Sequence, residues 1–194
     1  MHRRRFIAVT SALAATAGLA ACTTTPPSSD GSDAANAGRR RTIDADVDAT
    51  VTRLYETVQG SRELAAKARG MLVFPSVISA GFWIGGQYGQ GALRVDGRSN
   101  GYYSITAASF GLQIGAQSKA VILLFMTQDA LDEFTRSQGW AAGVDATVAV
   151  LKIGANGNID TSTATSPVEA IVMTNAGLMA GVSLEGSKIS RLII

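Results

Sequence analysis

The sequence predicts an α+β fold: a predominantly antiparallel, strongly curved sheet or barrel with an N-terminal helical pair and one further helix. Three patterns in residues 42–194 predict it. Apolar residues first recur at helical spacing, they then alternate with polar residues or form short apolar runs, and turn signals rich in Gly, Asn and Asp separate these runs. A stretch of about 150 residues suits one domain with a sizeable core.

The helical pair is predicted over roughly 44–59 and 62–69. In the first helix, apolar residues recur at helical spacing: Val47, Val51, Leu54, Tyr55 and Val58. Three acids fall in its predicted first turn, where the helix dipole favours negative charge: Asp44, Asp46 and Asp48. Ser61 is placed to cap the second helix, and Gly70 is placed to end it.

Strand patterns begin after this pair. The apolar run Met71–Phe74 precedes Pro75, and Phe82–Val95 has the pattern of a strand with glycine interruptions. The fully apolar run Val121–Met126 predicts a central strand. The same criteria predict further strands near 103–117, 144–150, 168–174, 178–184 and 188–194.

The further helix is predicted directly after the central strand. Thr127 is placed to cap it, and the helix should run to about Gln138. Leu131 and Phe134 should face the core, and Gly139 should end the helix.

The stretch GFWIGGQYGQG at 81–91 places five glycines in a region predicted to be strand. A dinucleotide-binding loop needs G-x-G-x-x-G between a strand and a helix, whereas the strand pattern continues here through 92–95. Two interpretations remain. In the first, the glycines let the sheet coil sharply or let backbone segments pack closely. In the second, they form the bottom of a shallow groove that an acyl chain or headgroup could approach.

The first 22 residues predict an export signal rather than part of the fold. Arg3–Arg5 is a basic segment, Phe6–Ala21 carries no charge, and the stretch ends in LAAC at 19–22. LAAC matches the bacterial lipoprotein box, so we predict a lipoprotein signal peptide at 1–21 and a lipidated Cys22 that carries acyl chains such as palmitate. An ordinary signal peptide with a stray cysteine is the alternative, and RRRFI leaves general and twin-arginine export both open.

Residues 22–41 are predicted to be the lipidated cysteine and a flexible tether, because they contain no large apolar side chain. The lipid should hold the mature chain on its membrane. Thr23, rather than aspartate, follows the cysteine, which by resemblance to sorted lipoproteins indicates the outer membrane of the bacterial envelope. The domain could face either the periplasm or the exterior.

The mature chain offers little chemistry for catalysis. The single histidine and the single cysteine are His2 and Cys22, so lipidation and cleavage of the signal leave neither a histidine nor a free thiol. This excludes histidine bases, Ser-His triads, cysteine nucleophiles and ordinary zinc sites, and no cofactor is predicted. Without the three signal arginines the net charge is about −1, which gives no indication of a nucleic-acid partner.

Four stretches carry a family resemblance: ARGMLVFPSVISAGF at 68–82 with GGQYGQG behind it, SFGLQIGAQ at 109–117, GVDATVAV at 143–150 and GLMAGVSLEGS at 177–187. In order and spacing they resemble the SYLF domain family from about residue 50 to the end. The resemblance implies a non-enzymatic, lipid-binding membrane module, and bacterial relatives are often lipoproteins. Eukaryotic relatives bind phosphoinositides and some bundle actin, but actin is not expected as a partner of an exported bacterial chain.

Basic and aromatic residues supply the candidates for lipid contact: Arg39, Arg40, Arg41, Arg62, Lys67, Arg69, Trp83 and Tyr88. The basic residues could face anionic headgroups or could simply be solvated. The two aromatic residues could anchor at a membrane interface or pack in the core. Glu185 and Asp145 could be acceptors at a ligand site, with Glu185 buried, or structural acids at glycine turns. No residue is assigned a catalytic role.

The preferred hypothesis is an envelope lipoprotein whose domain at 42–194 binds membrane lipid, through anionic headgroups or an acyl chain, without catalysing a reaction. The alternative is a tethered structural or interaction protein that docks onto another envelope component. An enzyme would need an unusual site built from Glu, Lys and Tyr.

Overall fold

The structure is a computed structural model that describes residues 29–111, 117–151, 165–174, 177–178 and 184–194, without the side chains of 29–31, 80–84, 109–111 and 177–178. The helices within these residues are α1 (Ser29–Thr57), α2 (Ser61–Lys67) and α3 (Gln128–Arg136). The strands are β1 (Gly70–Val95), β2 (Arg98–Gly111), β3 (Gln117–Phe125), β4 (Gly139–Ala141), β5 (Val148–Val150), β6 (Val168–Thr174), β7 (Gly177–Leu178) and β8 (Lys188–Arg191). The predicted α+β class is confirmed.

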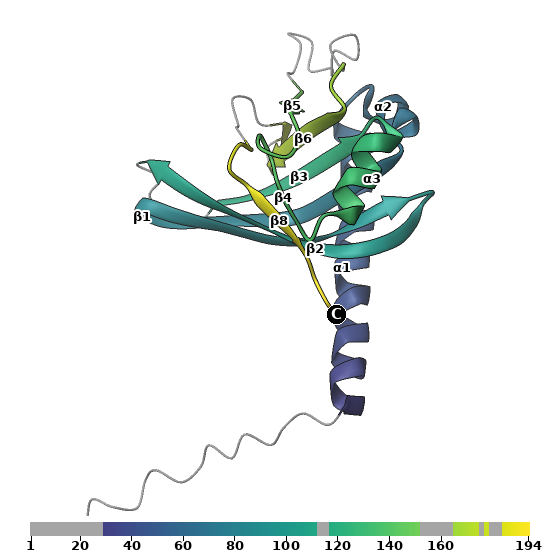
Figure 1. The fold of residues 1–194 in the computed structure, drawn as a ribbon, viewed down its shortest axis with the longest axis vertical. Coiled ribbons are helices and arrows are strands. Elements are labelled where there is room, and N and C mark those ends of the chain that lie inside the picture. Colours follow the sequence, from purple (N-terminus) through teal and green to yellow (C-terminus); the bar gives the residue numbers. More distant parts are fainter. Residues whose placement is uncertain (1–28, 112–116, 152–164, 175–176, 179–183) are drawn as a thin grey trace, which may run out of the picture.

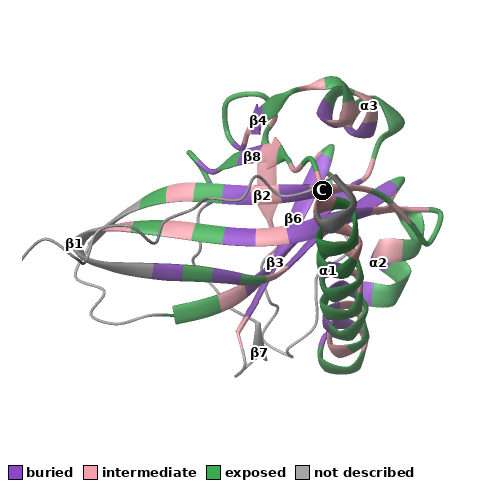
Figure 2. Ribbon diagram, turned by 90° about the horizontal axis from the view of Figure 1, so that it is seen from below, coloured by how far each residue is buried: buried purple, intermediate pink, exposed green. Residues whose placement is uncertain are grey.

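The strands form one curled sheet in the order β4-β8-β2-β1-β3-β6-β5, with β7 paired to β6. Among the described strands every pairing is antiparallel except that of β5 with β6, as predicted for most of the sheet. Figure 1 shows α1 and α2 on one face of this sheet and α3 on the other. Figure 2 shows that α1 covers only part of its face and leaves the long outer ends of β1 and β2 uncovered.

The core occupies both faces of the sheet. In β3, the odd-numbered residues of 121–125 belong to the apolar cluster under α3, and the even-numbered residues of 120–124 belong to the cluster under α1 and α2. A strand with helices on both faces has no solvent side, which explains why 121–126 is uninterruptedly apolar. Both clusters are built from residues between Ile43 and Ile194, so a chain that begins at Ser29 retains every described residue of the two clusters.

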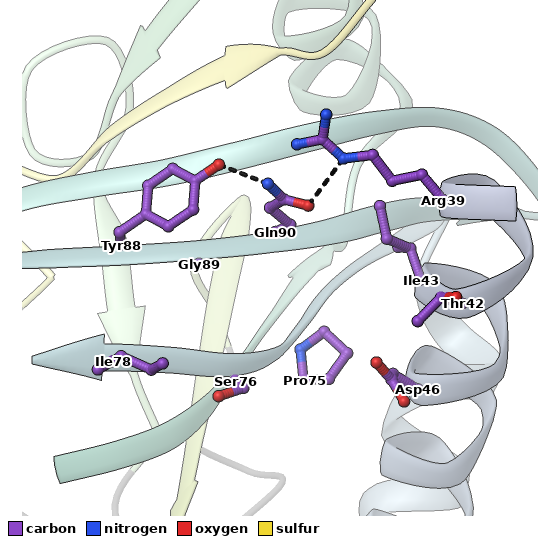
Figure 3. Close-up of a pocket in the computed structure, with 10 residues that line it drawn as sticks. All are labelled: Arg39, Thr42, Ile43, Asp46, Pro75, Ser76, Ile78, Tyr88, Gly89 and Gln90. Carbon is purple, nitrogen blue, oxygen red and sulfur yellow. Dashed lines mark hydrogen bonds between the residues drawn. The ribbon is translucent and has the colours of Figure 1, made fainter. Parts of the chain in front are cut away.

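β1 is one continuous strand that doubles back on itself, where the sequence predicts two separate strands. Residues 70–79 pair with β3 and residues 83–95 pair with β2, and Figure 3 shows the two parts side by side. A Cβ built on Gly91 would overlap the carbonyl oxygen of Val73 and lie 2.7 Å from its carbonyl carbon. Close backbone packing, the first interpretation of the glycine stretch, is therefore confirmed at Gly91. At Gly86, by contrast, a Cβ meets nothing within 4 Å.

α1 is longer than the sequence predicts. It begins at Ser29, so the flexible tether predicted over 22–41 is wrong for residues 29–41, and residues 22–28 lie outside the described part. A lack of large apolar side chains removes core contacts but does not oppose helix formation, and the alanine-containing start of α1 extends a helix that its packed C-terminal half already nucleates. The aspartates at 44, 46 and 48 consequently lie in the middle of α1 and not in its first turn.

The two predicted helix caps have different outcomes. Thr127 caps α3 as expected, because its side chain accepts a hydrogen bond of 3.2 Å from the backbone N–H of Ala130. Ser61 does not cap α2, whose N-cap is Gly60. Its hydroxyl instead donates to the carbonyl oxygen of Val58 at 2.6 Å, which ties the start of α2 to the end of α1.

Phe134 of α3 is the centre of an aromatic cluster on one face of the sheet. Its ring centroid lies 4.9 Å from that of Tyr103, 4.9 Å from that of Phe125 and 5.7 Å from that of Trp140. The Trp140 contact is edge-to-face, an arrangement that aromatic pairs favour. Leu131 and Phe134 are both buried, so their predicted inward orientation is confirmed.

Among the described residues, one carboxyl group is buried against the sheet. Glu169 of β6 is 0% exposed. Its Oε1 accepts a hydrogen bond of 2.9 Å from the backbone N–H of Ser166, and its Oε2 has no partner among the described residues. Burial raises the pKa of Glu169 above its ordinary value, although the Ser166 hydrogen bond opposes the rise.

We expect this carboxyl group to make stability depend on pH. Because the folded state keeps the Glu169 proton where the unfolded state loses it, the free energy of unfolding should fall as pH rises from about 4.5 through the raised native pKa, and level off above it. Glu169→Gln cannot ionise and should remove this part of the slope, whereas exposed Glu133→Gln should keep it. Urea unfolding at a series of pH values measures both slopes. Parallel curves for wild type and Glu169→Gln would contradict the expectation.

Candidate functional site

A groove of about 290 Å³ lies between α1 and β1 (Figure 3). Its lining comprises Arg39, Thr42, Ile43 and Asp46 from α1 with Pro75, Ser76, Ile78, Tyr88, Gly89 and Gln90 from β1. The groove exists because α1 crosses only the inner part of this sheet face, so the side chains just beyond the helix stay uncovered (Figure 2). Of the residues predicted to contact lipid, the groove brings together Arg39 and Tyr88.

Two large apolar side chains are exposed at this groove. Ile78 is 52% exposed and Tyr88 is 49% exposed. Alternate residues of a strand share a face, so Tyr88 and Gln90 stand on the same face of β1 as Ala92, which is buried under α1. Tyr88 is therefore not a core residue, and its role as an anchor at a membrane interface stays a prediction.

A chain of two hydrogen bonds connects the predicted residues. The Nε–H of Arg39 donates to Oε1 of Gln90 at 3.2 Å, and Nε2 of Gln90 donates to the hydroxyl of Tyr88 at 2.5 Å (Figure 3). Gln90 was not predicted as a site residue. Only its position opposite α1, 51 residues away from Arg39, makes it one.

The neighbouring arginines do not join Arg39 in the groove. A helix turns about 100° per residue, so Arg40 and Arg41 point in different directions from Arg39 and from each other. The basic cluster that the sequence suggests at 39–41 is therefore spread around α1, and one of its three members lines the groove.

The second predicted basic group lies at the other end of α1. Arg62 stacks over the ring of Tyr55 at 4.5 Å, and Lys67 and Arg69 are exposed. The C-terminus of α1, next to which they lie, is roughly 27 Å along the helix from Arg39. The two basic groups thus form no common face. The side chain of Trp83 and all of Cys22 lie outside the described residues.

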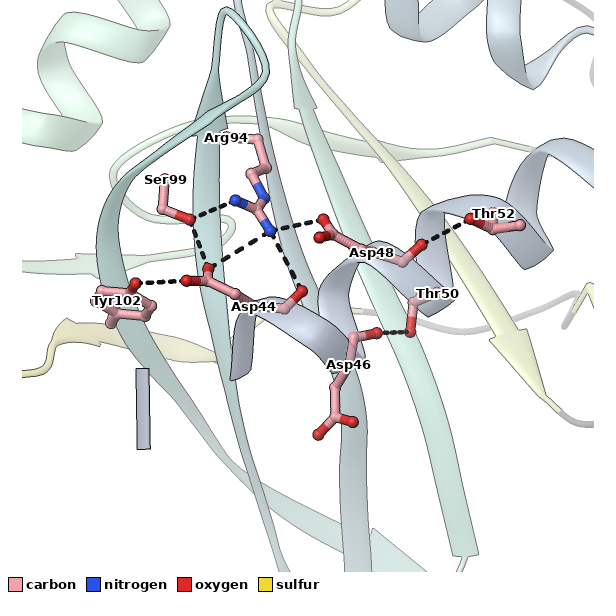
Figure 4. Close-up of polar contacts among 8 residues, drawn as sticks. All are labelled: Asp44, Asp46, Asp48, Thr50, Thr52, Arg94, Ser99 and Tyr102. Carbon is pink, nitrogen blue, oxygen red and sulfur yellow. Dashed lines mark hydrogen bonds and ion pairs between the residues drawn. The ribbon is translucent and has the colours of Figure 1, made fainter. Parts of the chain in front are cut away.

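A polar network fastens α1 to the sheet beside the groove (Figure 4). Arg94 donates to Asp48 at 2.6 Å and to Ser99 at 2.5 Å. Asp44 accepts hydrogen bonds from Ser99 at 2.6 Å and from Tyr102 at 2.8 Å. Partial burial and then the Asp44 carboxylate raise the pKa of Tyr102, so its hydroxyl stays a donor. Sequence reasoning assigned these aspartates to a helix start and missed their partners.

Replacing Arg94 with methionine should lower the free energy of unfolding by about 2 kcal/mol, because it leaves the partly buried Asp44 and Ser99 without their cationic partner. The side chain of Arg94 is 17% exposed, which limits solvent screening of its contacts. Arg98→Met, an exposed position on the same hairpin, is the matched control and should cost less than about 0.5 kcal/mol. Equal losses in denaturant unfolding would contradict a specific role of the network.

The two acids that sequence analysis singles out lie on two segments that contact each other. Asp145 accepts a hydrogen bond of 2.6 Å from the backbone N–H of Ala141, as a structural acid does. A Cβ on Gly143 would lie 3.1 Å from Cγ of Glu185, so the motifs at 143–150 and 177–187 meet here. Glu185 is exposed, and the interpretation of its side chain as a buried acceptor is wrong. This loop also shortens the strand predicted at 144–150 to β5.

Two features are not found among the described residues. No helix among them is long and apolar enough to cross a membrane. No group of three or more His, Cys, Asp and Glu side chains within them could hold a metal ion.

Residues 106–192 match the model of the Ysc84 family, whose description is Las17-binding protein actin regulator. The chain is also similar to SH3 domain-containing YSC84-like protein 1 of Homo sapiens and of Rattus norvegicus, with 32% identity over 127 residues, and to that of Bos taurus with 30%. The similarity covers 63% of this chain and 37% of each relative, so the chain spans little more than a third of their length.

The matched residues contain three of the four stretches that carry the resemblance, at 109–117, 143–150 and 177–187. The groove, which is built from residues between 39 and 90, precedes them. The family description names binding and actin regulation. The family resemblance is therefore confirmed over residues 106–192, which match the Ysc84 (SYLF domain) family.

Proposed function

We propose that the chain is a non-catalytic lipid-contacting module, held on a bacterial envelope membrane by lipid on Cys22, and that it meets lipid at the groove between α1 and β1. The observation that carries the proposal is the exposure of Ile78 and Tyr88 beside Arg39. An aliphatic side chain, an amphipathic ring and a cation at one site suit the boundary between headgroups and acyl chains.

The predicted anchor and the groove can act on the same membrane. Arg39 lies ten residues into α1 from Ser29, or about 15 Å along the helix axis. The segment from Cys22 to Ser29 can span at most roughly 24 Å when fully extended. A lipidated Cys22 therefore keeps the groove within reach of the bilayer surface in several orientations.

The proposal includes a modest preference for anionic lipid. One arginine near an anionic leaflet contributes about 1 kcal/mol. Asp46 also lines the groove, so the charges of the site are nearly balanced and Arg39 acts locally rather than through a broad basic surface. Most of the binding free energy should accordingly come from Ile78 and Tyr88.

The double substitution Ile78→Ser with Tyr88→Ser should weaken vesicle binding about ten-fold, because it removes the exposed apolar surface of the groove. The measurement is co-sedimentation of residues 29–194 with vesicles of phosphatidylglycerol and phosphatidylcholine at low salt. Val144→Ser removes an apolar side chain that is 80% exposed outside the groove, and it should leave binding unchanged. Absence of wild-type binding to any vesicle would reject the proposal, and equal losses in both variants would reject the groove.

The same Val144 supports a second candidate function, docking onto another envelope protein. Val144 sits in a loop held by backbone hydrogen bonds from the N–H groups of Val144 and Asp145 to the carbonyl oxygen of Ala141, at 3.2 and 2.9 Å. An exposed apolar side chain on an ordered loop is suited to a partner contact. A photo-crosslinker at position 144 in intact cells should trap one defined protein, and a crosslinker at Thr106, exposed on the sheet, should not.

A further inference from the structure

The guanidinium group of Arg39 is held from one side only. Its Nε–H is bonded to Oε1 of Gln90 at 3.2 Å, while neither of its Nη groups has a hydrogen-bond partner among the described residues. Figure 3 shows the side chain reaching from α1 over the sheet toward Gln90. The group is therefore oriented, and most of its donors remain available.

Gln90 is itself oriented by a second contact. Because its Nε2 donates to the hydroxyl of Tyr88 at 2.5 Å, its Oε1 must turn toward Arg39. Tyr88 thus has two separable parts in the groove: a ring that is half-exposed and a hydroxyl that fixes the Gln90 amide.

We propose that Gln90 is a positioning residue that holds Arg39 ready for an oxyanion, the phosphate group of a lipid. This inference rests on the proposed function and names the part of the ligand that the site selects. A guanidinium fork binds phosphate through two parallel N–H donors, and an orientation fixed in advance lowers the conformational entropy lost on binding. The Nε–H stays with Gln90, and the two Nη groups take the phosphate oxygens.

The charges around the site make this contact local. Asp46 is the other charged residue that lines the groove, and it comes from α1 two helical turns beyond Arg39. On the β1 side the lining residues carry no charge: Pro75, Ser76, Ile78, Tyr88, Gly89 and Gln90. A phosphate at Arg39 therefore meets no carboxylate from the strand that faces it.

The first test compares the binding of residues 29–194 to phosphatidylglycerol and to phosphatidylcholine vesicles. Phosphatidylcholine also carries a phosphate, but its cationic choline group neutralises the negative charge of the headgroup. The ratio of the two affinities therefore measures the preference of the site for an accessible anionic phosphate. Arg39→Gln should lower this ratio about five-fold. Gln90→Ala and Tyr88→Phe should each lower it about two-fold, although both leave the charge of the protein and the aromatic ring unchanged.

The decisive comparison repeats these substitutions in the Arg39→Gln background. If Gln90 and the Tyr88 hydroxyl act through Arg39, Gln90→Ala and Tyr88→Phe should have no further effect there. Gln87→Ala, on the opposite face of the same strand, and Tyr55→Phe, outside the groove, are the matched controls and should not change the ratio in either background. Effects of equal size with and without Arg39 would overturn the proposal.

A second test does not depend on vesicles. Inorganic phosphate, titrated into the same protein, should shift the Nε–H resonance of Arg39 in nitrogen-edited NMR spectra, and Tyr88→Phe should reduce the apparent affinity about two-fold. A phosphate shift without vesicle binding would uphold the oxyanion site and reject the membrane proposal. Vesicle binding with no phosphate shift and no effect of Gln90→Ala would uphold lipid contact and reject the role of Gln90.

Discussion

Gly91→Ala should lower the free energy of unfolding by about 3 kcal/mol or more, the upper range for forcing an atom into packed space. The new Cβ would overlap the carbonyl oxygen of Val73, lie 2.7 Å from its carbonyl carbon and lie 2.9 Å from Cδ1 of Phe74. Backbone atoms cannot rotate away as a flexible side chain can. Val73 is also fixed by its pairing with Ile122 of β3, so relief would require the sheet to uncurl.

Gly86→Ala is the matched control on the same strand. A Cβ at Gly86 meets nothing within 4 Å, so alanine there should leave stability unchanged or raise it by up to about 0.5 kcal/mol. Urea unfolding of residues 29–194, followed by circular dichroism, measures both variants. Similar midpoints for the two variants would show that the close approach at Gly91 does not constrain the fold.

Phe134→Ala should destabilise the fold by about 3–5 kcal/mol, the usual cost of deleting a buried aromatic side chain. Phe134 is 1% exposed and contacts the rings of Tyr103, Phe125 and Trp140. These rings come from β2, β3 and β4, so the side chain connects α3 to three strands of the sheet. Its loss would leave a cavity that the paired strands cannot close.

Phe134→Leu provides the graded comparison, because it keeps much of the apolar volume but removes the ring contacts. We expect it to cost about 1.5 kcal/mol, with a reduced near-ultraviolet circular dichroism signal from Trp140. If Phe134→Ala and Phe134→Leu unfolded at the same urea concentration, the cavity would not be what stabilises this face. Vesicle binding should survive both substitutions below their unfolding midpoints, because the groove lies on the opposite face.

Local patterns predicted those parts of the fold that depend on neighbours in the sequence. Thr127 and the spacing of Leu131 and Phe134 gave α3 its cap and its buried face, because a cap and its N–H lie three residues apart. The run 121–126 predicted a central strand because burial on both faces demands apolar residues at every position. The same reasoning failed for residues 29–41, whose composition has no signal for the helix that the packed half of α1 extends.

Only some residues of the candidate site could be predicted from the sequence. Arg39 and Tyr88 were predicted from their chemistry, but the same prediction included Arg62, Lys67 and Arg69. These three follow the C-terminus of α1 and lie far from the groove. Gln90 carried no signal, since an isolated glutamine in a strand predicts no function. Asp44 was assigned to a helix start, although its partner Tyr102 lies 58 residues away.

The sequence by itself determined the helices and strands that periodicity encodes, the family resemblance, and the expectation of an exported chain without histidine or thiol chemistry. Only the tertiary structure decided that Gly91 and not Gly86 is sterically required, that one of three adjacent arginines lines a groove, and that Gln90 holds it. The physical reason is distance along the chain. The periodicity of the sequence indicates on which face of its own helix or strand a residue lies. The curl of the sheet and the position of α1 across it determine which of these faces pack against each other.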